Sequence, residues 1–588
     1  MHIPLVLELL GGLLIAKAAA QNTSELNSTQ ELLDPLPYYY PNEDAAPQAL
    51  FPMPLCQGVQ LEEATIDQLQ DAMEHGNLTA YDIVTCYFKR YNQVNGYVNG
   101  ILQWNPDAFT IAAELDAERA AGRVRSRLHG IPFLVKDNIA TKDQMDTTAG
   151  SWALVGSIVP RDAHVVAKAR NAGALLLGHA TLSEWADMRS TNYSEGFSAR
   201  GGQARSPYNL TGNPGGSSSG SAVAVAANQA MFALGTETDG SVIDPAQRQN
   251  VCGIKPTTGL TSRAGVIPDT LHQDTIGTFG RTCRDAAYAL DAIAGPDPRD
   301  NYTLAQIGNT PEGGYAQFLT DKSALKGAVF GLPWETFWSL NDPEQNSHLM
   351  ELLDLIQSAG ATIINGTELP NADILISRKG FDGDYGTTRG YPNESEYTVL
   401  KVDFYNNIAT YLSELENTNI RSLEDIVQSN LDNLGSEGGL PGIHPAFYSG
   451  QDGLLNSLET KGVMDETYWQ AVWFCKTVTA ESLDAALNPF INGSHVKLDA
   501  LLVPPDLGQS YQVSAQAGYP VITVPAGIGG PSAMPFGLAL LGTKWGEGPL
   551  IHWASAIEDL QLSTDTPWKR TKPAWGDYMY RKLPVIRP

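Results

Sequence analysis

The chain has 588 residues, of which 43% are apolar, so it can bury a large core as one big domain or as two ordinary ones. This composition excludes a disordered or fibrous protein. Asp and Glu number 65 against 38 Lys and Arg, which gives a net charge of −27. Such an acidic chain argues against a nucleic-acid-binding surface, because that surface needs clustered Lys and Arg.

The first twenty residues have the pattern of a secretory signal. An apolar stretch over residues 5–16 is followed by Ala18-Ala-Ala20, a small-residue cleavage pattern before Gln21. The stretch is shorter than the ~20 residues that a membrane-spanning helix needs. We therefore predict a signal peptide over residues 1–20 that is cleaved, and an uncleaved signal anchor is the alternative because the start carries little positive charge.

Asn-x-Ser/Thr sequons occur nine times, and their acceptor chemistry operates only in a secretory pathway. They lie at Asn22, Asn27, Asn77, Asn192, Asn209, Asn301, Asn365, Asn393 and Asn492. The set predicts a secreted, extracellular eukaryotic glycoprotein. Glycans at Asn192 and Asn209 would crowd the active region described below.

The cysteines are few and widely spaced, which excludes a disulfide scaffold and a Cys-x-x-Cys zinc site. They are Cys56, Cys86, Cys252, Cys283 and Cys475. One or two disulfides are allowed, with a thiol left over, and their pairing stays open.

After the signal, residues 21–58 are polar and then rich in Pro and Tyr, which favours an extended arm. The folded region begins at two helix starts. Thr65 and Gln68 have the spacing of a capping box, and Thr79 with Asp82 repeats the pattern. We expect one domain over residues 59–570 and a C-terminal tail over 571–588.

Within this domain, predicted helices alternate with short apolar runs typical of strands buried on both faces. Helices are expected at residues 106–123 and 163–172, and strands at 131–135, 174–177, 230–234, 327–332, 374–376, 501–503, 521–524 and 536–541. The alternation predicts an α/β fold in which one sheet collects strands from both ends of the chain.

Residues 295–500 differ from the rest, with long glycine-rich connections such as 435–453 and with aromatic clusters. Inserted loops over a rigid sheet are where substrate selection resides, so we assign this region that role. Trp469 and Trp473, spaced i and i+4, are expected to pack in the core.

Two serines stand in separate glycine-rich turns. Ser217 lies in Gly-Gly-Ser-Ser-Ser-Gly-Ser, which precedes an Ala/Val helix, and Ser241 ends Gly-Thr-Glu-Thr-Asp-Gly-Ser 24 residues later. Ser217 is therefore expected at a helix N-terminus. Gly235 and Gly240 permit tight turns after a strand, so that backbone N–H groups near Ser241 can converge on an oxyanion.

Lys136 ends the apolar run of His-Gly-Ile-Pro-Phe-Leu-Val-Lys-Asp-Asn, as the last residue of a buried strand would. A serine hydroxyl needs a positioned base, and a lysine can act as one only when it is neutral. Burial at the strand end would supply the desolvation that this requires. Lys136, Ser217 and Ser241 can thus form one proton relay.

A competing motif is Gly-x-Ser-x-Gly at residues 216–220, which would make Ser218 the nucleophile of an α/β-hydrolase elbow. That elbow needs a strand directly before it. Residues 205–214 are polar and turn-forming, so this context fails.

Together these segments resemble the amidase signature family. The resemblance covers roughly residues 60–560 and rests on the motifs at 129–138, 183–185, 215–221, 235–245, 253–257, 517–525 and 535–538 in this order. It implies a single α/β/α domain around a mixed, mostly parallel sheet. It also implies a Ser-cisSer-Lys triad without metal or cofactor: Ser241 as nucleophile, Ser217 as bridging cis-serine and Lys136 as base.

The commonest family pattern has Asp-x-Gly-Gly-Ser and then Arg, whereas this chain has Glu237-Thr-Asp-Gly-Ser241 followed by Ile243. This form is similar to the branch that contains peptide amidase. The departure leaves the backbone N–H groups of Thr238, Asp239, Gly240 and Ser241 available as the oxyanion hole.

The resemblance implies a secreted hydrolase of linear carboxamides that passes through an acyl-enzyme and releases an acid with ammonia or amine. An esterase using the same triad and a catalytically silent binding protein remain alternatives. The enzyme component that supplies ammonia for charged-tRNA amidation shares the resemblance, but the signal and the sequons argue against it. The expected partner is a small-molecule or peptide amide, with no nucleic acid and no membrane span after cleavage.

Overall fold

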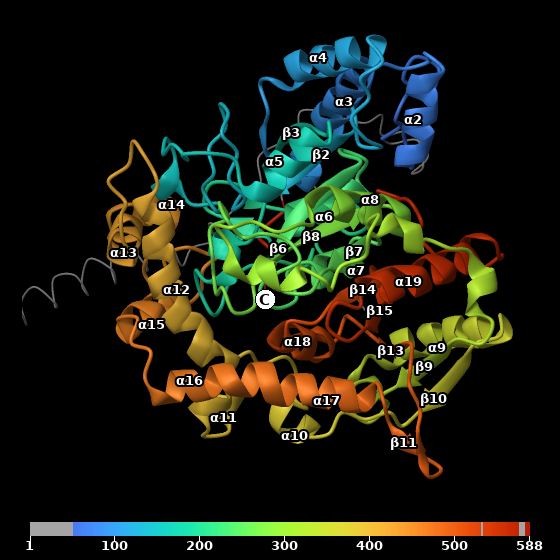
Figure 1. Cartoon of the computed structure of the whole chain (residues 1–588). Coiled ribbons are helices and arrows are strands. Elements are labelled where there is room, and N and C mark those ends of the chain that lie inside the picture. Colours follow the sequence, from blue (N-terminus) through green and yellow to red (C-terminus); the bar gives the residue numbers. More distant parts are fainter. Residues whose placement is uncertain (1–50, 531–532, 576–582, 588) are drawn as a thin grey trace, which may run out of the picture.

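A computed structural model describes residues 51–530, 533–575 and 583–587. The predicted signal peptide and most of the predicted arm lie outside the described residues. The architecture is built on one sheet of eleven strands in the order β1-β3-β2-β6-β8-β7-β14-β15-β13-β9-β10 (Figure 1). The strands are β1 (Ile101–Trp104), β2 (Pro132–Lys136), β3 (Leu175–Ala180), β6 (Phe232–Glu237), β7 (Cys252–Lys255), β8 (Thr275–Gly280), β9 (Val329–Leu332), β10 (Thr362–Asn365), β13 (Ala500–Val503), β14 (Val521–Gly529) and β15 (Met534–Leu541).

Helices cover both faces of this sheet. Leu502 of β13 packs in a cluster with side chains of α8 (Cys283–Ile293), α9 (Pro343–Ser358) and α19 (Glu547–Leu562). Its neighbours Leu501 and Val503 pack in another cluster with side chains of α17 (Thr479–Ala486) and α18 (Gly508–Ala517). Because successive strand residues point to opposite faces, these clusters lie on the two sides of the sheet. The expected α/β/α class is confirmed.

The two predicted helix starts are confirmed. Thr65 caps α2 (Ile66–Glu74) and Thr79 caps α3 (Ala80–Val98), each with a reciprocal capping box. The predicted helices at 106–123 and 163–172 appear as α4 (Ala108–Ala120) and α5 (His164–Asn171).

The sheet is mixed, but the expectation of mostly parallel pairing is wrong. β3, β2 and β6 pair in parallel, as do β13, β9 and β10. Between these two groups, and at the β1 edge, the neighbours are antiparallel. The reason is that β7 with β8, and β14 with β15, are consecutive strands that pair directly with each other, and direct pairing of consecutive strands favours antiparallel neighbours.

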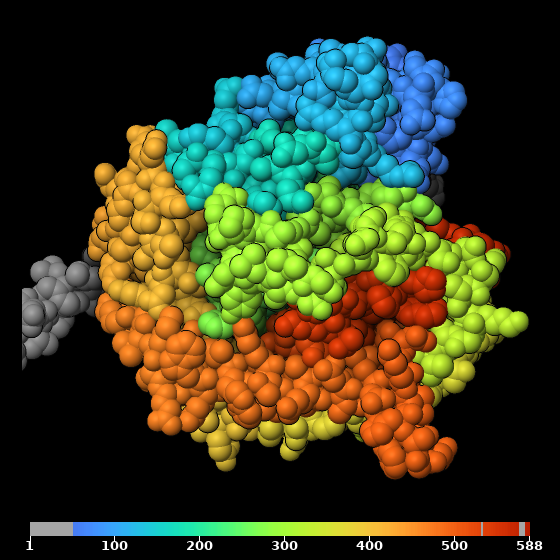
Figure 2. Space-filling view, viewed as in Figure 1, coloured from blue at the N-terminus to red at the C-terminus, as the bar shows by residue number. Residues whose placement is uncertain are grey.

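The regular structure over residues 295–500 is mainly helical, apart from β9, β10 and a short hairpin of β11 (Phe490–Ile491) and β12 (Ser494–His495). Besides α9 and α17 it contains α10 (Ala372–Leu375), α11 (Tyr385–Thr388), α12 (Glu396–Ser413), α13 (Leu423–Asp432), α14 (Leu434–Glu437), α15 (Asp452–Thr460) and α16 (Glu466–Trp473). The strand predicted at 374–376 is wrong, because these residues belong to or directly follow α10. Figure 2 shows that the yellow to orange part of the chain borders the green centre along its left and lower edges.

The structure contradicts the expectation that two tryptophans of the 295–500 region are buried. Trp469 and Trp473 are 53% and 61% exposed, so the prediction that they pack in the core is wrong. Both lie on α16, which presents them on its outward side.

Cys56 and Cys86 form a disulfide, while Cys252, Cys283 and Cys475 are buried free thiols.

Candidate active site

The structure brings the three predicted catalytic side chains into one continuous hydrogen-bonded line. Lys136 Nζ lies 2.8 Å from Ser217 Oγ, and Ser217 Oγ lies 3.0 Å from Ser241 Oγ. Lys136 and Ser217 are completely buried, and Ser241 is 4% exposed. Only Ser241 of the three borders the cavity described below. The geometry therefore orders the groups from a buried amine to a hydroxyl that a ligand can reach.

Three different elements hold these groups. Lys136 is the last residue of β2, which is buried along its whole length between β3 and β6. Ser217 follows a cis Gly216–Ser217 peptide bond just before α6 (Ser219–Ala226). Ser241 lies between β6 and α7 (Ile243–Arg248). The strand end and the two helix starts meet because β2 and β6 are parallel neighbours whose carboxyl ends face the same edge.

Two glycines of the motifs are required by close packing. A Cβ at Gly216 would lie 1.8 Å from the Glu195 carboxylate, and one at Gly240 would lie 2.3 Å from the Tyr511 ring. Gly240 also has φ +78°, which side-chain-bearing residues rarely adopt. The glycine-rich sequence thus lets both turns approach their neighbours closely enough to align the serines.

Burial lowers the pKa of Lys136 to about 8. Nearby carboxyls, with Asp187 and Asp269 foremost, act in the opposite direction and limit the shift. The Nζ group also donates to the backbone oxygen and the hydroxyl of Thr236, at 3.2 and 2.9 Å. A lysine with this pKa is neutral in an appreciable fraction of molecules near neutral pH, as a base must be.

Backbone N–H groups near Ser241 are free to bind an oxyanion. Among the described residues, the N–H groups of Thr238, Asp239 and Ser241 donate no hydrogen bond. The fourth predicted group, the Gly240 N–H, is directed toward the Glu237 carboxylate. Burial raises the pKa of Glu237, and this contact opposes the rise. Three of the four predicted donors are therefore unoccupied.

The buried Glu237 side chain stabilises the turn that carries Ser241. Its carboxylate accepts hydrogen bonds from the N–H groups of Val242 and Ile243, at 2.7 and 3.0 Å. It thereby satisfies the first N–H groups of α7 and fixes the path of the chain through Ser241. Glu237 lies within the Ser241 motif, but the spacing of the motif alone did not indicate that the Glu237 side chain stabilises this turn.

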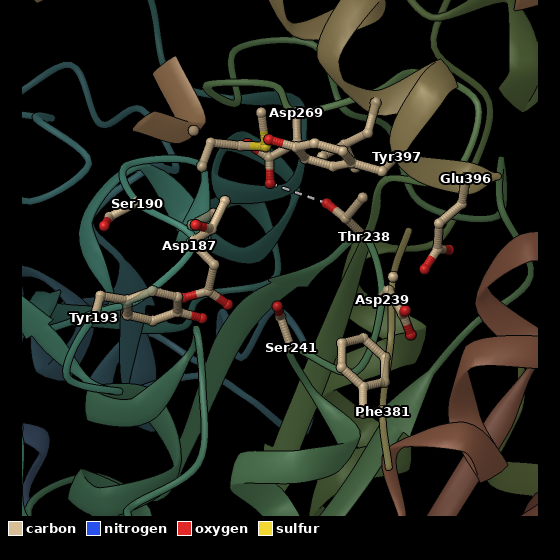
Figure 3. Close-up of a pocket in the computed structure, with 16 residues that line it drawn as sticks. Asp187, Ser190, Tyr193, Thr238, Asp239, Ser241, Asp269, Phe381, Glu396 and Tyr397 are labelled. Atoms are coloured by element: carbon tan, nitrogen blue, oxygen red, sulfur yellow. Dashed lines mark hydrogen bonds between the residues drawn. The ribbon is translucent and has the colours of Figure 1, made fainter. Parts of the chain in front are cut away.

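A cavity of about 210 Å³ opens over Ser241 (Figure 3). Its wall is formed by the segment around Asp187 to Tyr193, by the turn at Thr238 and Asp239, and by residues of the 295–500 region such as Phe381, Glu396 and Tyr397. The figure draws Ser241 between Asp187 on one side and Asp239 on the other. The 295–500 region, which is predicted to select the substrate, therefore supplies part of the cavity wall.

Sequence reasoning missed several residues of this site. Thr236 lies inside the Ser241 motif, so its contact with Lys136 could have been suspected from its position. Glu396 begins α12, far along the chain, in a segment with no motif. Only the packing of α12 against the catalytic core places it in the cavity wall.

The α/β-hydrolase alternative lacks its structural context. The elbow requires a strand directly before the nucleophile, and residues 204–216 contain no strand. The Ser218 hydroxyl donates instead to the backbone oxygen of Thr236, away from Ser241.

Comparisons with known proteins decide the family. Residues 82–380 match the family model described as Amidase. A Schizosaccharomyces pombe protein named "Putative amidase C869.01" is 55% identical over 97% of this chain and 96% of its own. The chain belongs to the amidase signature family.

A solved structure and a plant relative agree with this assignment. The native peptide amidase from Stenotrophomonas maltophilia is 36% identical, covers 87% of this chain and 99% of its own, and superposes with a TM-score of 0.74. A probable amidase of Arabidopsis thaliana is 38% identical over 86% of this chain and 92% of its own. The chain is accordingly an amide-hydrolysing enzyme with the fold of peptide amidase.

Among the described residues, neither a membrane-spanning helix nor a metal-binding group of side chains is found. In that part of the chain, no helix combines the length and the apolar character needed to cross a bilayer. The same residues contain no group of three or more His, Cys, Asp or Glu side chains that could hold a metal ion.

Proposed function

We propose that this amidase hydrolyses linear carboxamides through Ser241, Ser217 and Lys136. The observation that supports the proposal is the unbroken line from Lys136 Nζ through Ser217 Oγ to Ser241 Oγ, with steps of 2.8 and 3.0 Å. Both steps are within the reach of proton transfer. Ser241 stands at the cavity end and Lys136 at the buried end, as a nucleophile and a base should.

Acylation begins with neutral Lys136. Ser241 Oγ attacks the carbonyl carbon, its proton passes to Ser217, and the Ser217 proton passes to Lys136. The negative charge that develops on the carbonyl oxygen is stabilised by the unoccupied N–H groups of Thr238, Asp239 and Ser241. When the intermediate collapses, the C–N bond breaks and the proton returns through Ser217 to the leaving nitrogen.

Deacylation uses the same relay. Water attacks the acyl carbon and loses a proton through Ser217 to Lys136. The ester bond to Ser241 then breaks, its oxygen takes the proton back, and the acid leaves. The products are a carboxylic acid and ammonia or an amine.

The decisive test is release of ammonia or amine from a panel of peptide amides, aliphatic and aryl amides, and esters. Wild-type protein should release product, and Ser241→Ala protein should release at least about a thousandfold less. Ser218→Ala is the matched control, because Ser218 lies one residue from the relay and is not assigned to it. Loss of activity in Ser218→Ala but not in Ser241→Ala would contradict the assignment.

The panel also separates the alternatives. Turnover of esters alone would identify an esterase. A folded wild-type protein that turns over none of the panel would favour a silent binding protein.

We further propose that the protein is secreted after cleavage of residues 1–20. The apolar segment before Ala18-Ala-Ala20 and the sequons support this, and so does the Cys56–Cys86 disulfide, which is characteristic of oxidising compartments. N-terminal sequencing of protein from the culture medium should give Gln21 as the first residue. Protein retained in membranes with an intact N-terminus would support the anchor instead.

A further inference from the structure

Acidic side chains dominate the polar part of the cavity wall. Asp187, Asp239, Asp269 and Glu396 all line it, and no lysine or arginine is among the described residues that do so. Two buried lysines act on these carboxyls from outside the cavity: Lys136 directs its Nζ group to Ser217 and Thr236, and Lys255 directs its Nζ group to the backbone oxygens of Pro256 and Tyr519. The cavity carboxyls therefore have no cationic hydrogen-bond partner among the described residues that line the cavity.

The Asp239 carboxyl, in the cavity wall, lacks a hydrogen-bond donor in the part of the chain that the structure describes. Both of its oxygens are buried, and no described donor hydrogen-bonds to either of them. Burial and the neighbouring Glu396 carboxyl raise its pKa well above the ordinary value. A proton shared with Glu396 would satisfy one Asp239 oxygen and leave the other without a partner.

A second carboxyl faces the cavity from the opposite side. Asp187 Oδ1 is also buried without a hydrogen-bond partner among the described residues. Asp269, in contrast, already accepts a hydrogen bond from the Thr238 hydroxyl at 3.0 Å (Figure 3). A buried acceptor without a hydrogen bond is energetically unfavourable. A ligand that donates hydrogen bonds would therefore be stabilised beside Asp187 and Asp239.

Glu396 is held beside Asp239, and burial raises its pKa as well, so an ammonium ion between the two carboxyls would offset the cost of burying their charge. Gln512 and Gln273 donate to its two oxygens at 2.9 and 3.2 Å, which fixes the carboxylate beside Asp239. None of these carboxyls belongs to a group that could hold a metal ion among the described residues. This favours an organic donor over a metal cation.

We propose that the amide substrate carries a protonated amine close to the scissile carbonyl, and that Asp239 and Glu396 bind this amine. The inference rests on the proposed function for the position of the scissile bond. Asp239 precedes Ser241 by two residues, so their Cα atoms are at most about 7 Å apart. The amine is thus placed a few bonds from the carbonyl, as in amino-acid amides and short amino-terminal amides.

Three matched substrates test the proposal: β-alaninamide, butyramide and succinamate. They differ only in whether an ammonium, a methyl or a carboxylate group ends the same short chain. Wild-type protein at pH 7 should show a kcat/KM for β-alaninamide at least about tenfold above that for butyramide, with succinamate slowest. Equal or faster turnover of butyramide would overturn the proposal.

Variants assign the preference to the two carboxyls. In Asp239→Asn and in Glu396→Gln, the ratio of kcat/KM for β-alaninamide to that for butyramide should fall toward one. The ratio within each variant cancels any general loss of activity. Glu414→Gln, which removes a carboxylate from a surface ion pair with Arg161, is the charge control and should keep the wild-type ratio. A ratio that stays at the wild-type value in both cavity variants would overturn the assignment.

Calorimetry separates this proposal from the proposed function. Ser241→Ala protein should bind β-alaninamide at least about tenfold more tightly than butyramide, whether or not any amide is turned over. Absence of turnover with this binding preference would refute the hydrolysis and leave the amine site standing. Equal affinities for the two ligands would refute the amine site, even where wild-type protein hydrolyses both.

Discussion

The pH dependence of hydrolysis follows from the burial of Lys136. Its pKa is lowered to about 8, and in the proposed relay only the neutral amine can accept the proton of Ser241 through Ser217. The neutral fraction is about 1% at pH 6, about 9% at pH 7 and about 90% at pH 9. Activity should therefore fall as pH falls, by nearly tenfold for each unit below 7.

The assay is kcat/KM for butyramide or another amide without a titratable group, measured from pH 4 to 10. Circular dichroism at each pH would establish that the protein stays folded. We expect a rise of about 90-fold between pH 6 and pH 9 with a midpoint near 8. A profile that is flat down to pH 4, in protein that remains folded, would refute a neutral lysine as the base.

Three further predictions concern single residues. Ser217→Ala should lower kcat by about a hundredfold or more, with little change in melting temperature, because it interrupts the relay and removes few contacts. Gly240→Ala should lower both stability and activity, since its Cβ would lie 2.3 Å from the partly buried ring of Tyr511. Gly493→Ala, also at positive φ but with nothing within 4 Å, is the control. Cys86→Ser should lower the free energy of unfolding by about 3–4 kcal/mol, because the Cys56–Cys86 disulfide closes a loop across a separation of 30 residues.

Each of these has a contradicting outcome. Wild-type kcat in Ser217→Ala would show that protons bypass the bridging serine. Equal melting temperatures of the two glycine variants would show that the tyrosine contact exerts no strain. Denaturant unfolding of Cys86→Ser with an unchanged midpoint and slope would show that the loop closure contributes nothing.

The proposed catalytic residues could be picked out because each stands in local sequence with its own physical requirement. Glycines mark the turns around Ser217 and Ser241, and an apolar run places Lys136 at a buried strand end. Turn chemistry and strand burial are local properties, so a single sequence reveals them. The alignment of the three groups required only that β2 and β6 be neighbours, which the structure shows.

The remaining features depend on packing between distant segments. Asp239 was expected to contribute its backbone, whereas its side chain becomes notable only because α12 brings Glu396 beside it. A run of three apolar residues cannot distinguish strand from helix, which is why residues 374–376 were assigned incorrectly. Likewise, the spacing of Trp469 and Trp473 is compatible with a buried or an exposed helix face.

Sheet pairing was the least predictable part of the fold. Apolar runs locate strands buried on both faces, but they do not give the direction of each neighbour. The antiparallel pairs β7–β8 and β14–β15 arise from consecutive strands within the sheet. The short connection with Gly530 and Pro531 between β14 and β15 is a hairpin signal, whereas the long connection between β7 and β8 carries none.

The most direct test of the central claim is covalent labelling of the native protein with a fluorophosphonate, followed by peptide mass spectrometry. We predict a single phosphonylated residue, Ser241, with labelling that slows as pH falls below 8 and that is absent from Ser241→Ala protein. Labelling at Ser217 or Ser218, or labelling of Ser241→Ala at the wild-type rate, would contradict the assignment of Ser241 as the nucleophile.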